Sequence, residues 1–166
     1  MVTEIEKRFE ERKLIKQEIR TTVIISIALL VSVGIYTLLA YFIKIVPPIL
    51  DKEPLEKMYA IINLIVIVIM VVILGVRRSI YYSPRFIKED FTLPQVLQKW
   101  RMIDIFLLVV TETIPICGLV ITLLGMPFKR TFHFFLASAL LMIILMPGGL
   151  KIKGKLSILR KTHPDL

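Results

Sequence analysis

One stretch of this sequence, residues 102–125, limits most strongly what the chain can fold into. It reads MIDIFLLVVTETIPICGLVITLLG, which is about the length that a helix needs to cross a bilayer. Near its middle lies a carboxylate, Glu112, and Pro115 follows about one turn later. A charge at that depth costs roughly 2.5–3.5 kcal/mol on insertion scales, so we expect Glu112 to be protonated, paired or in a wet cavity.

Three further long apolar runs accompany this one, in a chain of 166 residues that is 56% hydrophobic. The sequence therefore predicts an all-α protein, an integral membrane four-helix bundle at residues 21–146. The expected spans cover about 21–45, 58–76, 102–125 and 131–146. A helix at residues 1–20 precedes the bundle and a basic tail at residues 147–166 follows it.

The N-terminal segment, residues 1–20, is predicted to be an amphipathic helix. Thr3 and Glu6 match a capping box. Its apolar side chains recur on one stripe at helical spacing, at Ile5, Phe9, Ile15 and Ile19. Three arrangements stay open: a helix docked on the lipid headgroups, a helix that runs straight into the first span, or a solvated extension.

Polar residues give one further expectation each for the third and the second helix. Thr92 and Gln95 form a second capping box, and Pro94 suits a first-turn position, so the third helix is expected to begin near Leu93. Asn63 is the only strongly polar side chain of the second apolar run. We expect it to form an interhelical hydrogen bond.

The distribution of basic residues predicts the orientation. Lys and Arg gather in the N-terminal segment, in the connection at residues 77–101 and in the tail, whereas the two intervening loops are poor in them. The positive-inside rule then places both termini in the cytoplasm. The net charge of +9 is accordingly interpreted as a topology signal, with no nucleic-acid partner and with anionic lipid headgroups as neighbours.

Counting depth along the spans gives candidate partners for Glu112. It lies about eleven residues into a span that starts from the cytoplasmic side, and the matching depth of the first span falls near Ser32. Tyr36 lies one turn farther along the same stripe. If the first and third spans pack together, Ser32 and Tyr36 are expected to hydrogen-bond Glu112.

The proline next to this carboxylate adds a second possibility. Because Pro115 has no N–H, the carbonyl of Thr111 loses its intrahelical partner. This carbonyl, the hydroxyls of Thr111 and Thr113, and Glu112 could together hold a proton, a cation or a water. Alternatively, the threonines only repair the kink, and Glu112 stays neutral in a packed bundle.

Asp104 lies two turns before Glu112 in the same span. Its simplest interpretation is an interfacial residue that meets Lys99 or Arg101. A functional relay from Asp104 to Glu112 is the alternative.

The segment Glu112-Thr-Ile-Pro-Ile-Cys-Gly-Leu-Val120 resembles the ion-binding helix of rotary ATPase proteolipid (c-type) subunits, which carries Glu followed by Ile-Tyr-Gly-Leu-Val. The resemblance covers this span alone, with Cys117 in place of the tyrosine. It implies that Glu112 binds a proton or sodium ion, and that Gly118 and Leu119 pack behind it. The whole chain looks like a small four-span bacterial protein, which implies a multi-pass protein of the bacterial cytoplasmic (inner) membrane.

Chemical motifs of enzymes are not found in the sequence, which has no Gly-rich phosphate loop, metal-ligand spacing or Ser–His–Asp set. We therefore expect no catalysis, cofactor or metal. The leading hypothesis is a membrane protein that assembles with itself or with other membrane subunits. The alternative is a small proton- or cation-translocating subunit in which Glu112, Thr111, Ser32 and Tyr36 form the binding site and Pro115 and Gly118 shape the helix packing.

Overall fold

The computed structural model describes residues 2–43, 51–82 and 93–146, and its regular structure there is entirely helical. The helices are α1 (Val2–Ile43), α2 (Lys52–Tyr82), α3 (Leu93–Leu123) and α4 (Phe128–Leu145). Each is long and apolar enough to cross a membrane. The predicted all-α architecture with four potential spans is thus confirmed, whereas the tail at residues 147–166 lies outside the described residues.

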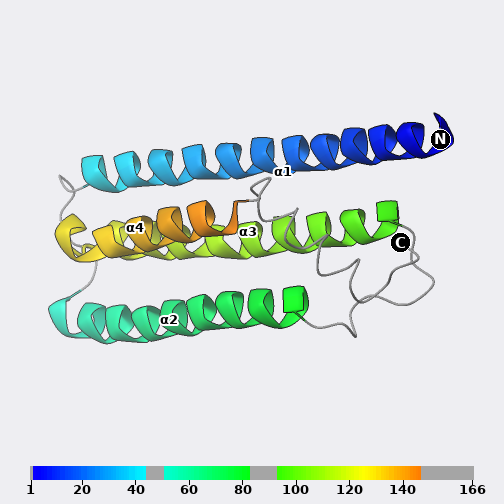
Figure 1. Cartoon of the computed structure of the whole chain (residues 1–166). Coiled ribbons are helices and arrows are strands. Elements are labelled where there is room, and N and C mark those ends of the chain that lie inside the picture. Colours follow the sequence, from blue (N-terminus) through cyan, green and yellow to red (C-terminus); the bar gives the residue numbers. More distant parts are fainter. Residues whose placement is uncertain (1, 44–50, 83–92, 147–166) are drawn as a thin grey trace.

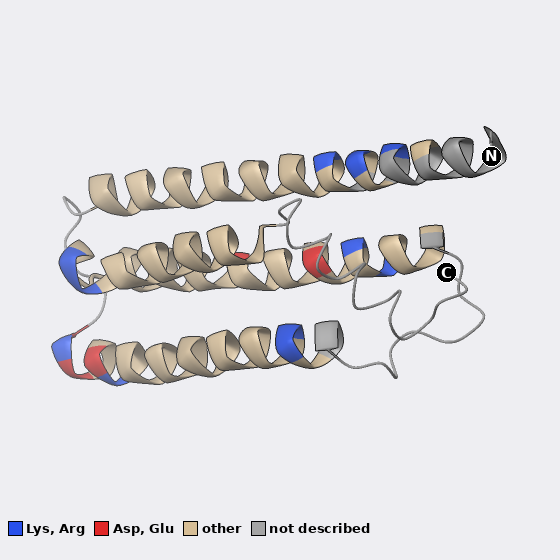
Figure 2. Ribbon diagram, viewed as in Figure 1, with Lys and Arg blue, Asp and Glu red and all other residues tan. Residues whose placement is uncertain are grey.

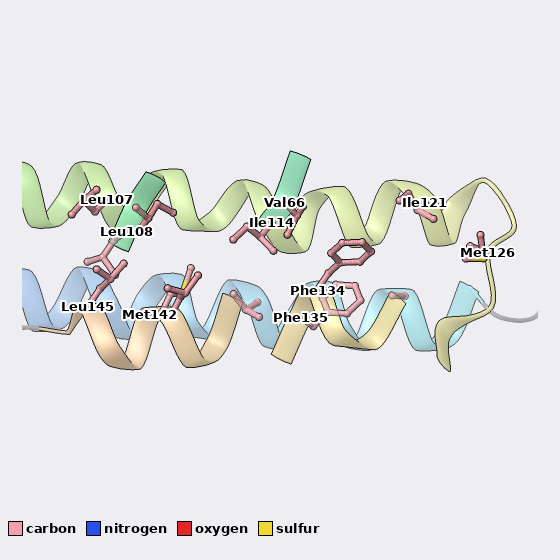
Figure 3. Close-up of a cluster of buried hydrophobic side chains, with 14 of the residues drawn as sticks. Val66, Leu107, Leu108, Ile114, Ile121, Met126, Phe134, Phe135, Met142 and Leu145 are labelled. Carbon is pink, nitrogen blue, oxygen red and sulfur yellow. The ribbon is translucent and has the colours of Figure 1, made fainter. Parts of the chain in front are cut away.

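Helix α3 is the centre of the bundle. It packs against α1 on one side and α2 on the other, and α4 lies against both α3 and α1 (Figure 1). Most of the core side chains therefore come from α3 and α4, as the close-up in Figure 3 shows. Those from α3 are Leu107, Leu108, Ile114 and Ile121, and those from α4 are Phe134, Phe135, Leu141, Met142 and Leu145.

Helix α1 is continuous from Val2 to Ile43. The N-terminal segment therefore continues straight into the expected first span, as in the second of the three arrangements left open by the sequence. Phe9 is exposed on this segment, whereas Ile15 and Ile19 are half-buried. The amphipathic character of residues 1–20 stays a prediction, because most of their side chains lie outside the described part of the chain.

The packed side of α1 follows an alternating spacing of four and three residues. Its members are buried or half-buried: Ile15, Ile19, Thr22, Ser26, Leu29, Val33, Tyr36 and Ala40. Such a heptad pattern keeps one seam of a helix facing its neighbour along its whole length. The same pattern occurs on α3, where all members are buried: Leu97, Trp100, Asp104, Leu107, Thr111, Ile114, Gly118 and Ile121.

The connection from α3 to α4 is a tight turn that its sequence explains. Gly125 has φ 113°, a conformation that favours glycine. Its N–H donates to the carbonyl of Thr122 at 3.1 Å, and the N–H of Met126 donates to that of Ile121 at 3.1 Å. This pair of bonds is the Schellman motif, and it satisfies the last carbonyls of α3. The short turn holds α4 antiparallel to α3 in a fixed register.

Charged side chains gather toward the two ends of the helices, and the long middle parts are mostly apolar (Figure 2). We call the end where α1 and α3 begin and α2 finishes the basic end, and the opposite one the turn end. At the turn end, Asn63 of α2 meets the ring Nε2 of His133 of α4 at 3.3 Å. The interhelical hydrogen bond predicted for Asn63 is therefore present.

Helix α3 begins at Leu93, as its capping pattern predicted, although Thr92 itself lies outside the described residues.

Candidate functional site

The candidate site lies where the middle of α1 meets the middle of α3. The hydroxyl of Ser32 is hydrogen-bonded to Oε1 of Glu112 at 2.6 Å, and the hydroxyl of Tyr36 reaches the same oxygen at 3.4 Å. All three side chains are half-buried. The hydrogen bonds expected from depth counting are therefore formed, the one from Ser32 at short range and the one from Tyr36 at the long limit.

The two carboxyl oxygens of Glu112 differ in their surroundings. Both hydroxyls from α1 reach Oε1, whereas Oε2 accepts no hydrogen bond from the residues that the structure describes. The neighbouring side chains Val109, Thr113 and Ile116 are exposed on the same part of α3. The carboxyl is thus held from one side by α1 and is open on the other.

Thr111 lies on a different side of α3 from this carboxyl. Its side chain is fully buried, and its hydroxyl donates to the carbonyl of Leu107 at 2.8 Å. The hydroxyl of Thr113 likewise donates to its own helix, at the carbonyl of Val110. No hydrogen bond among the described residues joins either threonine hydroxyl to the Glu112 carboxyl. Of the two alternatives that the sequence left open, the cluster of threonine hydroxyls around Glu112 is not formed, because both hydroxyls bond to α3 itself.

The carbonyl that Pro115 leaves without a helical partner is bound from another helix. The hydroxyl of Ser138 on α4 donates to the carbonyl of Thr111 at 3.3 Å, and both residues are fully buried. This carbonyl accordingly serves the packing of α3 on α4 and does not point into an ion site. Ser138 was not identified from the sequence.

Gly118 marks the closest approach of α4 to α3. A Cβ added there would lie 2.9 Å from Cβ of Phe134 and 3.3 Å from Cζ of Phe135. These distances leave no room for a methyl group, so the glycine lets the two helices touch. One turn on, the buried hydroxyls of Thr122 and Thr131 join α3 and α4 at 2.8 Å, a contact that sequence reasoning missed.

Asp104 is buried, with 6% of its surface exposed, on the α3 seam that also carries Thr111 and Gly118. The interpretation of Asp104 as an interfacial residue that meets Lys99 or Arg101 stays a prediction. A relay from Asp104 to Glu112 stays a prediction. Across the described part of the chain, no three His, Cys, Asp or Glu side chains gather closely enough to hold a metal ion.

The four helices, each with the length and apolar composition of a span, indicate a multi-pass helical membrane protein. No protein-family model matches the chain, and no curated protein or solved structure matches it either. The resemblance of α3 to a proteolipid helix accordingly stays a prediction.

Proposed function

We propose that this chain is a non-enzymatic integral membrane protein that assembles with itself or with other membrane subunits, and that Glu112 is its protonatable site. The observation that carries this proposal is the one-sided hydrogen bonding of the carboxyl. Its Oε1 is bound by α1, whereas Oε2 has no partner among the described residues and opens beside exposed apolar side chains. In lipid, a carboxyl bound on one oxygen only is most stable when it is neutral, and its Oε2 can then accept a hydrogen bond from another chain.

The bonding of Ser32 supports a protonated carboxyl. Its hydroxyl has a single hydrogen but lies near two acceptors, the carbonyl of Leu29 at 2.7 Å and Oε1 of Glu112 at 2.6 Å. Both contacts are hydrogen bonds at once when Glu112 carries a proton. The carboxyl O–H then donates to Ser32, and Ser32 donates to Leu29. An ionised carboxylate would have to compete with Leu29 for the one hydrogen.

The proposal includes a location and an orientation. The chain would lie in the bacterial cytoplasmic membrane with both termini in the cytoplasm, so that the basic end faces inward. Glu112 would then lie near the middle of the hydrocarbon layer. Nucleic acid is not among the proposed partners.

A second function, a proton- or cation-translocating subunit, is favoured by the chemistry of the same group. A carboxyl that is bound by two hydroxyls and remains open on one side can release a proton and take it up again. The resemblance of residues 112–120 to the proteolipid motif supports the same function. In this alternative, Ser32 and Tyr36 hold the carboxyl between the two steps.

Glu112→Gln separates the two functions, because the amide keeps the shape and the hydrogen bonding but does not titrate. If the chain only assembles, this variant keeps the wild-type oligomeric state in lipid nanodiscs, whereas Glu112→Leu lowers it. Wild-type proteoliposomes then show no proton flux above protein-free vesicles. If the chain translocates, wild-type flux is present, is lost in Glu112→Gln and is retained in the control Glu56→Gln at the turn end.

A carbodiimide that modifies protonated carboxyls within the membrane tests the site itself. We expect adduct formation on the peptide that contains Glu112, and its loss in Glu112→Gln. Absence of the adduct from the wild-type peptide would contradict a neutral, accessible carboxyl and with it both functions.

A further inference from the structure

The two ends of the bundle differ in how their basic side chains are compensated. At the turn end, Lys57 pairs with Glu53 at 2.8 Å, and Arg130 of α4 pairs with Glu56 of α2. At the basic end, Arg77 and Arg78 of α2 form no ion pair with any other residue that the structure describes. Two of the basic side chains at the turn end are therefore paired with carboxylates, whereas both arginines at the end of α2 are unpaired within the described chain.

Arg77 is placed unusually for an uncompensated charge. It follows Val66 and Ile73 on the side of α2 that packs against the bundle, four residues after the fully buried Ile73. Its side chain is half-buried, whereas the adjacent Arg78 is exposed. Such an arginine can pack its aliphatic stem against the bundle while its guanidinium remains available to a negatively charged group.

The level of these residues along α2 indicates which anion is within reach. The apolar run of the helix ends at Val76, and the two arginines follow immediately. Basic residues directly beyond an apolar span lie at the depth of the lipid headgroups. Guanidinium groups match phosphate oxygens in a bidentate geometry, and they do so better than an ammonium group does.

We propose that the end of α2 is a binding site for the headgroup of an anionic phospholipid, whose phosphate is held by Arg77 and Arg78. The half-buried Arg77 holds the phosphate against the bundle, and the exposed Arg78 holds it from the outer side. This proposal does not depend on the one for Glu112, because lipid binding at Arg77 and Arg78 requires neither assembly nor ion movement.

Native mass spectrometry of the full chain in detergent tests the site by titration with phosphatidylglycerol, phosphatidylcholine or inorganic phosphate. We expect wild-type protein to retain phosphatidylglycerol in preference to phosphatidylcholine. The double variant Arg77→Gln/Arg78→Gln should weaken this binding about 30-fold, or about 2 kcal/mol at about 1.4 kcal/mol per tenfold change. The matched control Lys52→Gln/Lys129→Gln removes the same charge from exposed residues at the turn end and should leave binding unchanged.

Three results would overturn the proposal. The first is that wild-type protein retains the two lipids equally. The second is that the arginine and lysine double variants lose phosphatidylglycerol binding to the same extent. The third is that an equal concentration of inorganic phosphate displaces the lipid. The last result would assign the site to a soluble anion. If the glutamine variant does not fold, Arg77→Lys/Arg78→Lys keeps the charge and loses the bidentate geometry. The affinity of this lysine variant for phosphatidylglycerol should then lie between the wild-type value and that for phosphatidylcholine. An affinity equal to that of the wild type would contradict the role of the guanidinium groups.

Discussion

Ser138 on α4 donates its hydroxyl hydrogen to the carbonyl oxygen of Thr111 on α3, at 3.3 Å and with both residues fully buried. In a regular helix this carbonyl would accept a hydrogen bond from the N–H of residue 115, but Pro115 has no N–H. A buried carbonyl without a donor is costly in lipid, where water cannot replace the missing bond. Helix α4 thus supplies the hydrogen-bond donor that Pro115 lacks. The proline in α3 is therefore accommodated by the packing of α3 on α4.

Removal of this hydroxyl should destabilise the bundle. We expect Ser138→Ala to lower the free energy of unfolding by about 1 kcal/mol, as for other interhelical hydrogen bonds in membranes. Unfolding in mixed micelles can be followed by the fluorescence of Trp100, the single tryptophan. In a Pro115→Ala background the N–H is restored, so Ser138→Ala should cost less there. An equal cost in both backgrounds would show that the two residues are not coupled.

The glycine at the crossing of α3 and α4 should tolerate no side chain. A methyl group at Gly118 would press on Cβ of Phe134, so we expect Gly118→Ala to destabilise by about 1–3 kcal/mol. Gly34 of α1 is the matched control, because nothing lies within 4 Å of a Cβ added there. Gly34→Ala should be neutral or stabilise by up to about 1 kcal/mol through helix propensity. Similar melting temperatures for the two variants would refute the close contact at Gly118.

The contact between Ser32 and Glu112 could be predicted from the sequence because α1 and α3 were expected to cross in the same direction. Two parallel helices that enter at the same boundary advance by about 1.5 Å per residue each, so equal counts give equal depth. Four potential spans followed from apolar length alone, because a bilayer sets the length of the elements that cross it.

Ser138 could not be identified in the same way, since its partner lies on an antiparallel helix. The register of α3 against α4 depends on the turn at Gly125, and equal counting away from that turn brings residues near 138 to the level of Thr111. A signal for Ser138 was therefore present in the sequence, but it required the turn geometry. The sequence left two roles open for the Thr111 and Thr113 hydroxyls, because a helical threonine can either bond to a carbonyl of the preceding turn or turn toward a neighbouring group.

The hydroxyls that reach Glu112 should contribute unequally to stability. Ser32 approaches Oε1 at 2.6 Å and Tyr36 at 3.4 Å, so we expect Ser32→Ala to cost about 1 kcal/mol and Tyr36→Phe less. Thr113→Val is the control at the same depth, because its hydroxyl bonds only to its own helix, and its effect should stay within about 0.5 kcal/mol. Chemical unfolding of the three variants checks this order. A larger effect for Tyr36→Phe than for Ser32→Ala would contradict it.

The paired hydroxyls of Thr122 and Thr131 should show strong coupling. They lie 2.8 Å apart, with 4% and 0% of their surfaces exposed, so removal of one leaves the other without its interhelical partner. We expect Thr122→Val and Thr131→Val each to lower the unfolding free energy by about 1 kcal/mol. The double variant should cost little more than either single one, because an apolar pair of the same shape leaves no hydroxyl stranded between the helices. Additive losses in this double-mutant cycle would mean that each hydroxyl acts only through its own helix, where Thr122 donates to the carbonyl of Gly118 at 2.8 Å and Thr131 to that of Phe128 at 3.2 Å.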